Sequence, residues 1–193
     1  MLANKLVQGI LLSTTVLLSG CATLDKLNAP SLNGGPTTSA LVVVKTEAIM
    51  HGIFDIKTPQ QIESGVLLST DGSRGVDGHA VAGLIIFSGV PPGEYNLARV
   101  QTAWQSGTYI NQHTYDVPPW EAVNFIINVK VGEPKYLGVV TVEEMRKTDQ
   151  RGVIFDLKQS KESEVAAWEK FSELYQGSPW TIEVQKRLTE LRR

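Results

Sequence analysis

The chain has 193 residues with 18 basic and 20 acidic side chains, three histidines and one cysteine, and its formal net charge is −2. This near balance excludes the strongly basic surface with which proteins bind nucleic acid. A single cysteine cannot form a disulfide within the chain. The stability of the fold must therefore come from a packed core, which a chain of this length can bury.

The most hydrophobic run lies near the N-terminus and has the layout of a secretory signal. Lys5 gives it a positive start, Leu6 to Leu18 form the apolar segment, and small residues follow. A transmembrane helix is the competing interpretation, but about thirteen residues at ~1.5 Å each give roughly 20 Å, against ~30 Å of hydrocarbon. We therefore expect residues 1–20 to be a cleaved signal peptide.

The apolar run closes with Leu18, Ser19, Gly20 and Cys21, and Cys21 is the only cysteine. These four residues resemble the lipobox of bacterial lipoproteins. The resemblance implies cleavage between Gly20 and Cys21, acylation of Cys21, and, because Ala22 is not an aspartate, sorting to the periplasmic face of the outer membrane. Two or more acyl chains anchor a protein stably, at ~0.8 kcal/mol per buried methylene. The alternative is an ordinary signal peptide with a chance cysteine.

Residues 22–40 are small and polar and are interrupted by Gly34, Gly35 and Pro36. Such a stretch cannot bury enough apolar area to fold by itself. We therefore predict that residues 21–40 form a lipidated N-terminus and a flexible tether. A coil of this length spans roughly 25 Å, enough to lift a domain clear of the lipid head groups.

From residue 41 the hydrophobic period becomes two, which is typical of strands with one buried face. The most regular case runs from Val123 to Val131, and turn signals such as Asp71-Gly72 and Pro118-Pro119 separate the runs. About eight short strands without an intervening helical pattern predict a mainly β domain over residues 41–158, folded as an antiparallel β-sandwich. The other runs are residues 41–50, 65–70, 79–87, 94–104, 107–117, 135–142 and 153–158.

The segment from Val90 to Leu97 reads VPPGEYNL. Pro92 presets φ for the first central position of a type II turn and Gly93 supplies the positive φ at the second, so the chain is predicted to reverse and enter a strand at Tyr95. The Tyr95 hydroxyl is then placed to bond the preceding loop, as in the tyrosine corner of immunoglobulin-like sandwiches. The segment resembles the V-x-P-G-x-Y signature of transthyretin-like and carboxypeptidase-regulatory-like domains, which implies that fold. We interpret these residues as a structural turn rather than a ligand loop.

The period becomes helical at the C-terminus. Ser160 is a candidate cap for a first helix that Gly177 ends, and Ser178 with Pro179 begins a second. So short a break predicts an αα-hairpin over residues 159–193. Apolar residues share one side of each helix: Ala167, Trp168, Phe171, Leu174 and Tyr175 on the first, together with Glu164, and Trp180, Val184, Leu188 and Leu191 on the second.

The aromatic members of this stripe allow two interpretations. They either pack against the sandwich or within the helix pair, or they form a surface for a partner protein, since exposed aromatic patches usually mark contacts. The candidate partner surface consists of Trp168, Phe171, Tyr175 and Trp180.

No residue pattern indicates catalysis, a cofactor or a metal. The spacing of His51, His79 and His113 is not that of metal ligands, and the loop from Asp71 to Gly78 lacks the alternating acidic ligands of a calcium site. We interpret that loop as a hairpin turn. Glu143 and Glu144 adjoin two basic residues and read as a solvated, charged edge.

The favoured function is a non-enzymatic structural or adaptor lipoprotein of the bacterial envelope. It would contact the membrane through its lipid and an envelope-assembly or transport partner through its helical hairpin. The alternative is a module that binds glycans or small molecules, as transthyretin-like sandwiches sometimes do. Four aromatic residues are candidates for its stacking faces: Trp104, Tyr109, Tyr115 and Trp120.

Overall fold

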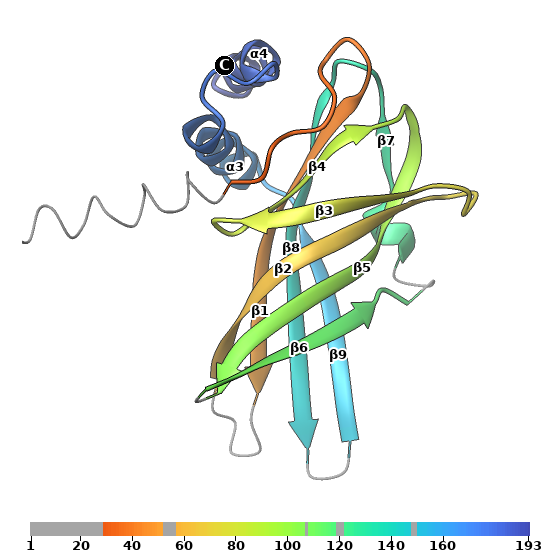
Figure 1. The fold of residues 1–193 in the computed structure, drawn as a ribbon, viewed down its shortest axis with the longest axis vertical. Helices are drawn as coiled ribbons and strands as arrows, with labels where there is room; N and C mark the ends of the chain where they lie inside the picture. Colours follow the sequence, from red (N-terminus) through yellow and green to blue (C-terminus); the bar gives the residue numbers. More distant parts are fainter. Residues whose placement is uncertain (1–28, 52–56, 107, 119–121, 148–149) are drawn as a thin grey trace, which may run out of the picture.

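The computed structural model describes residues 29–51, 57–106, 108–118, 122–147 and 150–193. Strands dominate this part of the chain and two helices end it, so the predictions of a mainly β fold and of two C-terminal helices are confirmed (Figure 1). The elements are β1 (Ala40–His51), β2 (Lys57–Ser69), β3 (Gly75–Val81), β4 (Leu84–Val90), β5 (Gly93–Ser106), β6 (Tyr109–Asp116), the 3-10 helix η1 (Val123–Phe125), β7 (Ile127–Val129), β8 (Pro134–Lys147), β9 (Gln150–Lys158), α3 (Lys161–Leu174) and α4 (Thr181–Leu191).

The strands form one sheet in the order β6-β5-β2-β3-β4-β1-β8-β9, and β7 pairs with β5. The first residues of β2 pair with the end of β1, but its later residues pair with β3, so the β3–β4 hairpin fills the fork between β1 and β2. The sheet curls as a result, and Figure 1 shows β5 and β2 crossing the direction of β1 and β8.

The prediction of a purely antiparallel sandwich is wrong, because one pair of strands is parallel. β1 and β8 run parallel over eleven paired residues, from Leu41 with Pro134 to His51 with Met145. All other strand pairs in the described residues are antiparallel, so the sheet is mixed and continuous. The sequence pattern missed this because most of the domain separates the two strands along the chain, whereas turn signals report only neighbouring strands.

The strand predicted from the most regular alternation is much shorter than expected. Val123 to Phe125 form a 3-10 helix, and only Ile127–Val129 pair with β5. Phe125, Ile127 and Val129 are buried, whereas Val123, Ile126 and Val131 are exposed. The alternation therefore identifies core side chains only in the middle of the segment, at Phe125, Ile127 and Val129, and most of the segment is not a strand.

The first part of β1, from Ala40 to Val44, is buried on both faces. Ala40, Val42 and Val44 belong to the inner core inside the curl, whereas Leu41 and Val43 belong to an outer core under the helices. This explains why the strand opens with an uninterrupted apolar run, a pattern typical of strands covered on both sides. The inner core is completed by side chains from across the curl, among them Ile85, Phe87, Tyr95, Leu97, Val100, Phe125, Val129, Leu137, Val140 and Val142.

The helical hairpin covers the outer face of the sheet beside β1 and β4. The Ser163 N–H donates to the Ser160 side chain at 3.1 Å, and the Ser160 N–H donates back to the Ser163 hydroxyl at 3.3 Å, which forms a capping box at the start of α3. Gly177, with φ of +75°, lies in the turn between the helices. The second helix begins later than predicted: Trp180 precedes its first residue, Thr181, and Ser178 is not its side-chain cap.

The aromatic stripe faces the protein interior. Trp168 and Trp180 are 0% exposed and Phe171 is 1% exposed, and all three pack with Leu41 and Val43 of β1. Tyr175 is half-buried and stacks on Phe171 with 4.9 Å between ring centroids. These aromatic side chains cover the outer face of β1. The interpretation of Trp168, Phe171, Tyr175 and Trp180 as a partner surface is therefore wrong.

The prediction of a flexible tether is wrong for residues 29–40. Ala29 and Leu32 pack against the outer core, and the Asn33 N–H donates to the Ser88 hydroxyl at 2.8 Å. Ser39 is buried, and its carbonyl accepts from the Gly132 N–H at 2.9 Å. Residues 29–40 thus belong to the folded domain, whereas residues 22–28 lie outside the described part of the chain.

Replacing Trp180 tests whether the hairpin is part of the same folded unit as the sheet. We expect Trp180→Ala to lower the free energy of unfolding by roughly 3–5 kcal/mol, because it empties a fully buried site between helix and sheet. The control is Ile182→Ala, at a side chain that is 77% exposed, with an expected change within ~0.5 kcal/mol. Urea denaturation measures both, and equal effects in the two variants would contradict this packing.

Candidate functional site

A groove lies between α4 and the turn that precedes β8. Its volume is about 540 Å³, and its floor is formed by residues 130–136. Gln159 and Glu164 line one side and charged residues of α4 line the other. The groove is therefore built jointly by the sheet and the helical hairpin, two parts of the chain that are separate in the sequence.

The turn under this groove is held by the N-terminal segment. Gly132 adopts a φ of +79°, and a Cβ at this position would lie 3.0 Å from the Pro36 carbonyl oxygen. The Glu133 N–H also donates to the Lys130 carbonyl at 3.1 Å. The turn is thus held between its own backbone hydrogen bond and residues 36–39, and only glycine fits its left-handed conformation beside the Pro36 carbonyl.

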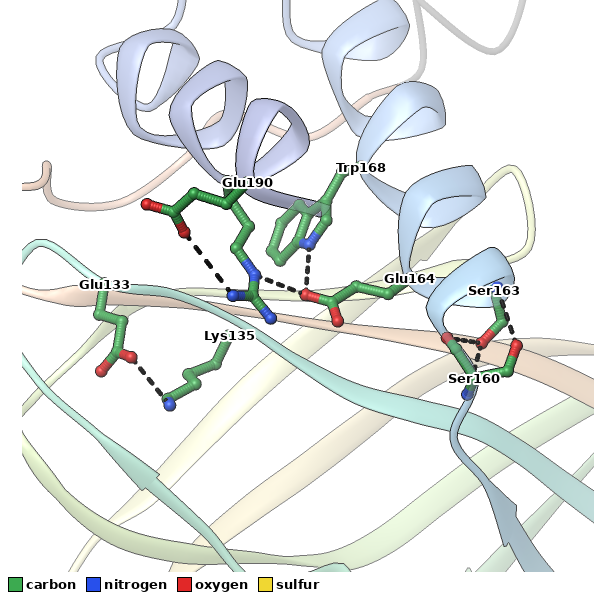
Figure 2. A network of polar contacts seen from close by, with 8 residues as sticks. Glu133, Lys135, Ser160, Ser163, Glu164, Trp168 and Glu190 are labelled. Atoms are coloured by element: carbon green, nitrogen blue, oxygen red, sulfur yellow. Dashed lines mark hydrogen bonds and ion pairs between the residues drawn. The ribbon is translucent and has the colours of Figure 1, made fainter. Parts of the chain in front are cut away.

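The two helices meet over the groove at a shared carboxylate. Glu164 Oε1 accepts hydrogen bonds from Trp168 Nε1 at 3.1 Å and from Arg187 Nε at 2.8 Å. Figure 2 shows Glu164 reaching from α3 toward α4. Arg187 Nη1 also forms an ion pair with Glu190 Oε2, 3.8 Å away. The hydrogen bond with Glu164 raises the pKa of the Arg187 guanidinium above its usual value. This junction fixes the angle between the helices and keeps one wall of the groove in place.

Charges of both signs line the groove in equal number. Some pair with each other, as Lys135 does with Glu133 at 2.8 Å (Figure 2). Lys130, Glu183 and Lys186 form no ion pair within the described residues. Such a surface suits neither a polyanion nor a highly charged small ligand. The acidic members are Glu133, Glu164, Glu183 and Glu190, and the basic members are Lys130, Lys135, Lys186 and Arg187.

A second polar cluster lies inside the curl. The Tyr115 hydroxyl donates to Glu144 Oε2 at 2.6 Å, and His113 Nδ1 lies 3.2 Å from the same oxygen. Glu144 is only 2% exposed, so the interpretation of Glu143 and Glu144 as a solvated edge is wrong for Glu144. β6 and β8 are not neighbours in the sheet, so these hydrogen bonds cross its interior. They supply partners that a buried carboxylate needs.

The sequence contained a signal for both polar positions. Glu164 lies on the apolar stripe of α3, one helical turn before Trp168, and Glu144 continues the inward series of Val140 and Val142 in β8. A charged residue on an apolar face indicates a buried partner. Neither residue is predicted to have a buried partner from the sequence, because the partners of both carboxylates are distant along the chain.

The reversal before β5 differs in detail from the predicted type II turn. Gly93 has a positive φ of +152°, far from the +80° of that turn type, and the left-handed residue is Gly89 at +72°. Pro92 occupies a bend and Tyr95 lies in β5, 1% exposed. The Tyr95 ring packs against Gly93, but its hydroxyl makes no hydrogen bond to the preceding loop within the described residues. The segment is a structural turn without the predicted tyrosine-corner bond.

Several other candidates lie elsewhere or outside the described structure. Residues 1–28, which include Gly20 and Cys21, are not described, and neither are the side chains of His51, Trp104, Tyr109 and Trp120. His79 is exposed on β3, whereas His113 belongs to the cluster inside the curl. Within the part of the chain that is described, no three His, Cys, Asp or Glu side chains are grouped to hold a metal ion.

The loop after β2 is a hairpin turn organised by Asp71. Asp71 Oδ1 accepts hydrogen bonds from the Ser69 hydroxyl at 2.6 Å and from the Ser73 backbone N–H at 3.0 Å and hydroxyl at 2.7 Å. These hydrogen bonds lower the pKa of the Asp71 carboxyl to about 2, and the bond from the Ser69 hydroxyl has the largest effect. The carboxylate is thus engaged with its own turn, in agreement with the hairpin interpretation.

No protein-family model matches the chain, and neither the curated proteins nor the solved structures contain a match. None of the described helices has the length and apolar character needed to cross a membrane. The structure therefore defines the class by itself: a mainly β protein with one curled, mixed sheet, a helical hairpin packed on its outer face, and a charged groove where the two meet.

Removing the shared carboxylate tests the junction that forms the groove wall. We expect Glu164→Ala to lower the free energy of unfolding by ~1–3 kcal/mol, because it leaves the Trp168 indole N–H and the Arg187 guanidinium without their acceptor. The matched control is Glu169→Ala on the same helix, whose ion pair with Arg192 is exposed, with an expected cost below ~0.5 kcal/mol. Thermal or urea unfolding measures both, and a control variant as damaging as Glu164→Ala would refute the role of this junction.

Proposed function

We propose that this protein is a lipid-anchored, non-enzymatic adaptor of the bacterial cell envelope that holds a partner protein in the groove beside α4. Two features support the proposal. The sequence Leu18-Ser19-Gly20-Cys21, with its single cysteine, supports the anchor and its location at the outer membrane. The groove, which exists only because the hairpin is fixed to the sheet, supports the adaptor role.

The observation that carries the adaptor role is the mixed charge of the groove. Glu183 and Lys186 are both on α4, line the groove, and form no ion pair within the described residues. A protein segment with acidic and basic side chains in register can pair with both, which gives specificity rather than a large affinity. A groove about 540 Å³ in volume accommodates a loop or an extended segment of such a partner.

The transthyretin-like assignment of the sheet remains a proposal based on the VPPGEYNL segment. The alternative function, binding of a glycan or small molecule to the sheet, has less support. One of its four candidate aromatic residues, Tyr115, is engaged inside the protein. The Tyr115 hydroxyl is bonded to Glu144, and its half-buried ring packs against the inner core. We therefore place the binding surface at the groove and not on the sheet.

The anchor is tested by Cys21→Ser. We expect this variant to lose metabolic labelling with radioactive palmitate and to remain uncleaved by the lipoprotein signal peptidase, because the acceptor thiol is gone. Labelling and membrane fractionation of the wild-type protein and the variant measure this. Palmitate incorporation that persisted in Cys21→Ser would refute the lipobox interpretation.

The adaptor role is tested by site-specific photocrosslinking in intact cells. A photoreactive amino acid at position 186 is expected to capture one reproducible envelope protein, whereas the same probe at Ser73, an exposed position in the β2–β3 turn, is not. Charge reversal at the neighbouring Glu183→Lys is expected to reduce the crosslink, and so is added salt, since pairs at an exposed surface are screened. A monomeric protein that gives no crosslink at position 186, or equal crosslinks at both positions, would contradict the proposal.

A further inference from the structure

The N-terminal segment joins the folded domain much earlier than its composition suggests. Ala29, the first described residue, already packs against the outer core together with Leu32. Further along, a Cβ at Gly35 would lie 3.6 Å from the Pro179 side chain, so the segment passes the turn between α3 and α4. Figure 1 shows it running beside the helices before it enters β1.

Packing of this segment shortens the connection to the lipid. Only eight residue steps separate Cys21 from Ala29. At ~3.3–3.6 Å per residue they cannot exceed roughly 28 Å, whatever their conformation. By comparison, the 14 residues of β8 extend over about 45 Å at ~3.3 Å per residue. The connection is therefore shorter than the domain that it holds.

The helical end of the domain is suited to a position next to lipid. Residues 159–193 contain six acidic and six basic side chains, so anionic head groups neither repel nor strongly attract this part of the chain. Its large exposed apolar side chain is Ile182, which is 77% exposed on the first turn of α4, three residues after Pro179. An isoleucine at this position gains free energy when it enters the head-group region.

The end of β5 and the start of β6 lie away from the helical hairpin, at what we call the β5–β6 turn. Ile110 pairs with Gln105 near this turn, and Ala103 of the same strand pairs with Gln61, beside the end of β1 that lies away from the helices. Figure 1 shows the end of β5 and the start of β6 near the lower end of β1, away from α4. Ile110 is 72% exposed and thus matches Ile182 in residue type and exposure.

From these observations we propose that the domain is held against the bilayer surface with the helical hairpin facing the lipid head groups and the β5–β6 turn pointing away. The proposal rests on lipidation of Cys21, as proposed above. It also restricts the partner, because the groove beside α4 then lies at the membrane-proximal end of the domain. A protein that binds there must itself reach the membrane surface, as a membrane protein or another lipoprotein does.

The orientation is tested with the mature lipidated protein reconstituted in vesicles of neutral phospholipid that contain a head-group spin label. Since acylated Cys21 has no free thiol, an environment-sensitive fluorophore can be attached selectively to Ile182→Cys or to Ile110→Cys. We expect loss of most of the fluorescence through quenching at position 182 and little loss at position 110. Equal quenching at the two positions, or stronger quenching at 110, would overturn the proposed orientation.

A spacer variant separates the effect of tether length from that of surface affinity. A Gly/Ser insertion of about a dozen residues directly before Ala29 raises the upper limit of the connection from roughly 28 Å to roughly 70 Å and is expected to reduce quenching at position 182 severalfold. Unchanged quenching would overturn the role of the short connection. Failure of the proposed anchor is distinguishable, because an unlipidated protein would not float with the vesicles at all.

Discussion

The structure depends on the need to cover both faces of β1. Its side chains alternate between the inner core and the outer core, and neither core is complete without a distant part of the chain. Curling of the sheet closes the inner core, and the helical hairpin closes the outer core with Trp168, Phe171 and Trp180. Burying one such aromatic side chain contributes on the order of 3 kcal/mol to the free energy of folding. The same contacts therefore stabilise both the hairpin and the sheet. The groove beside α4 is a consequence of this packing.

Polar side chains at the borders of the two cores determine how their covers are placed. Glu164 accepts from the indole of Trp168 and from Arg187 and thereby sets α4 relative to α3, whereas Glu144 accepts from Tyr115 and ties β6 to β8 across the curl. Each carboxylate is mostly removed from solvent, so losing its partners is costly and the arrangement is specific. Because the N-terminal segment is fixed in the same region, the short connection to a lipid at Cys21 would set the orientation of the whole domain.

The sequence predicted local features well and distant pairings poorly. Period-two alternation identified Phe125, Ile127 and Val129 as core residues, and the capping residue Ser160 marked the start of α3, because both signals depend on neighbours along the chain. The parallel pairing of β1 with β8 and the docking of residues 29–40 depend on contacts between distant segments, which no local pattern reports. The aromatic stripe of the helices was also predicted from the sequence. That it packs on the sheet and does not bind a partner depends on the outer face of β1, which is distant in the sequence. The polar partners of Glu144 and Glu164 were missed for the same reason.

Native-state hydrogen exchange tests the central claim most directly, namely that the hairpin and the curled sheet are one cooperative unit. It measures the free energy of opening at each backbone amide as denaturant is added. The account predicts that the protected amides of β1, α3 and α4 exchange through the same global unfolding, with opening free energies that converge at low denaturant. Exchange of α3 and α4 at a clearly lower free energy, while β1 stays protected, would show that the sheet folds without its helical cover and would contradict the account.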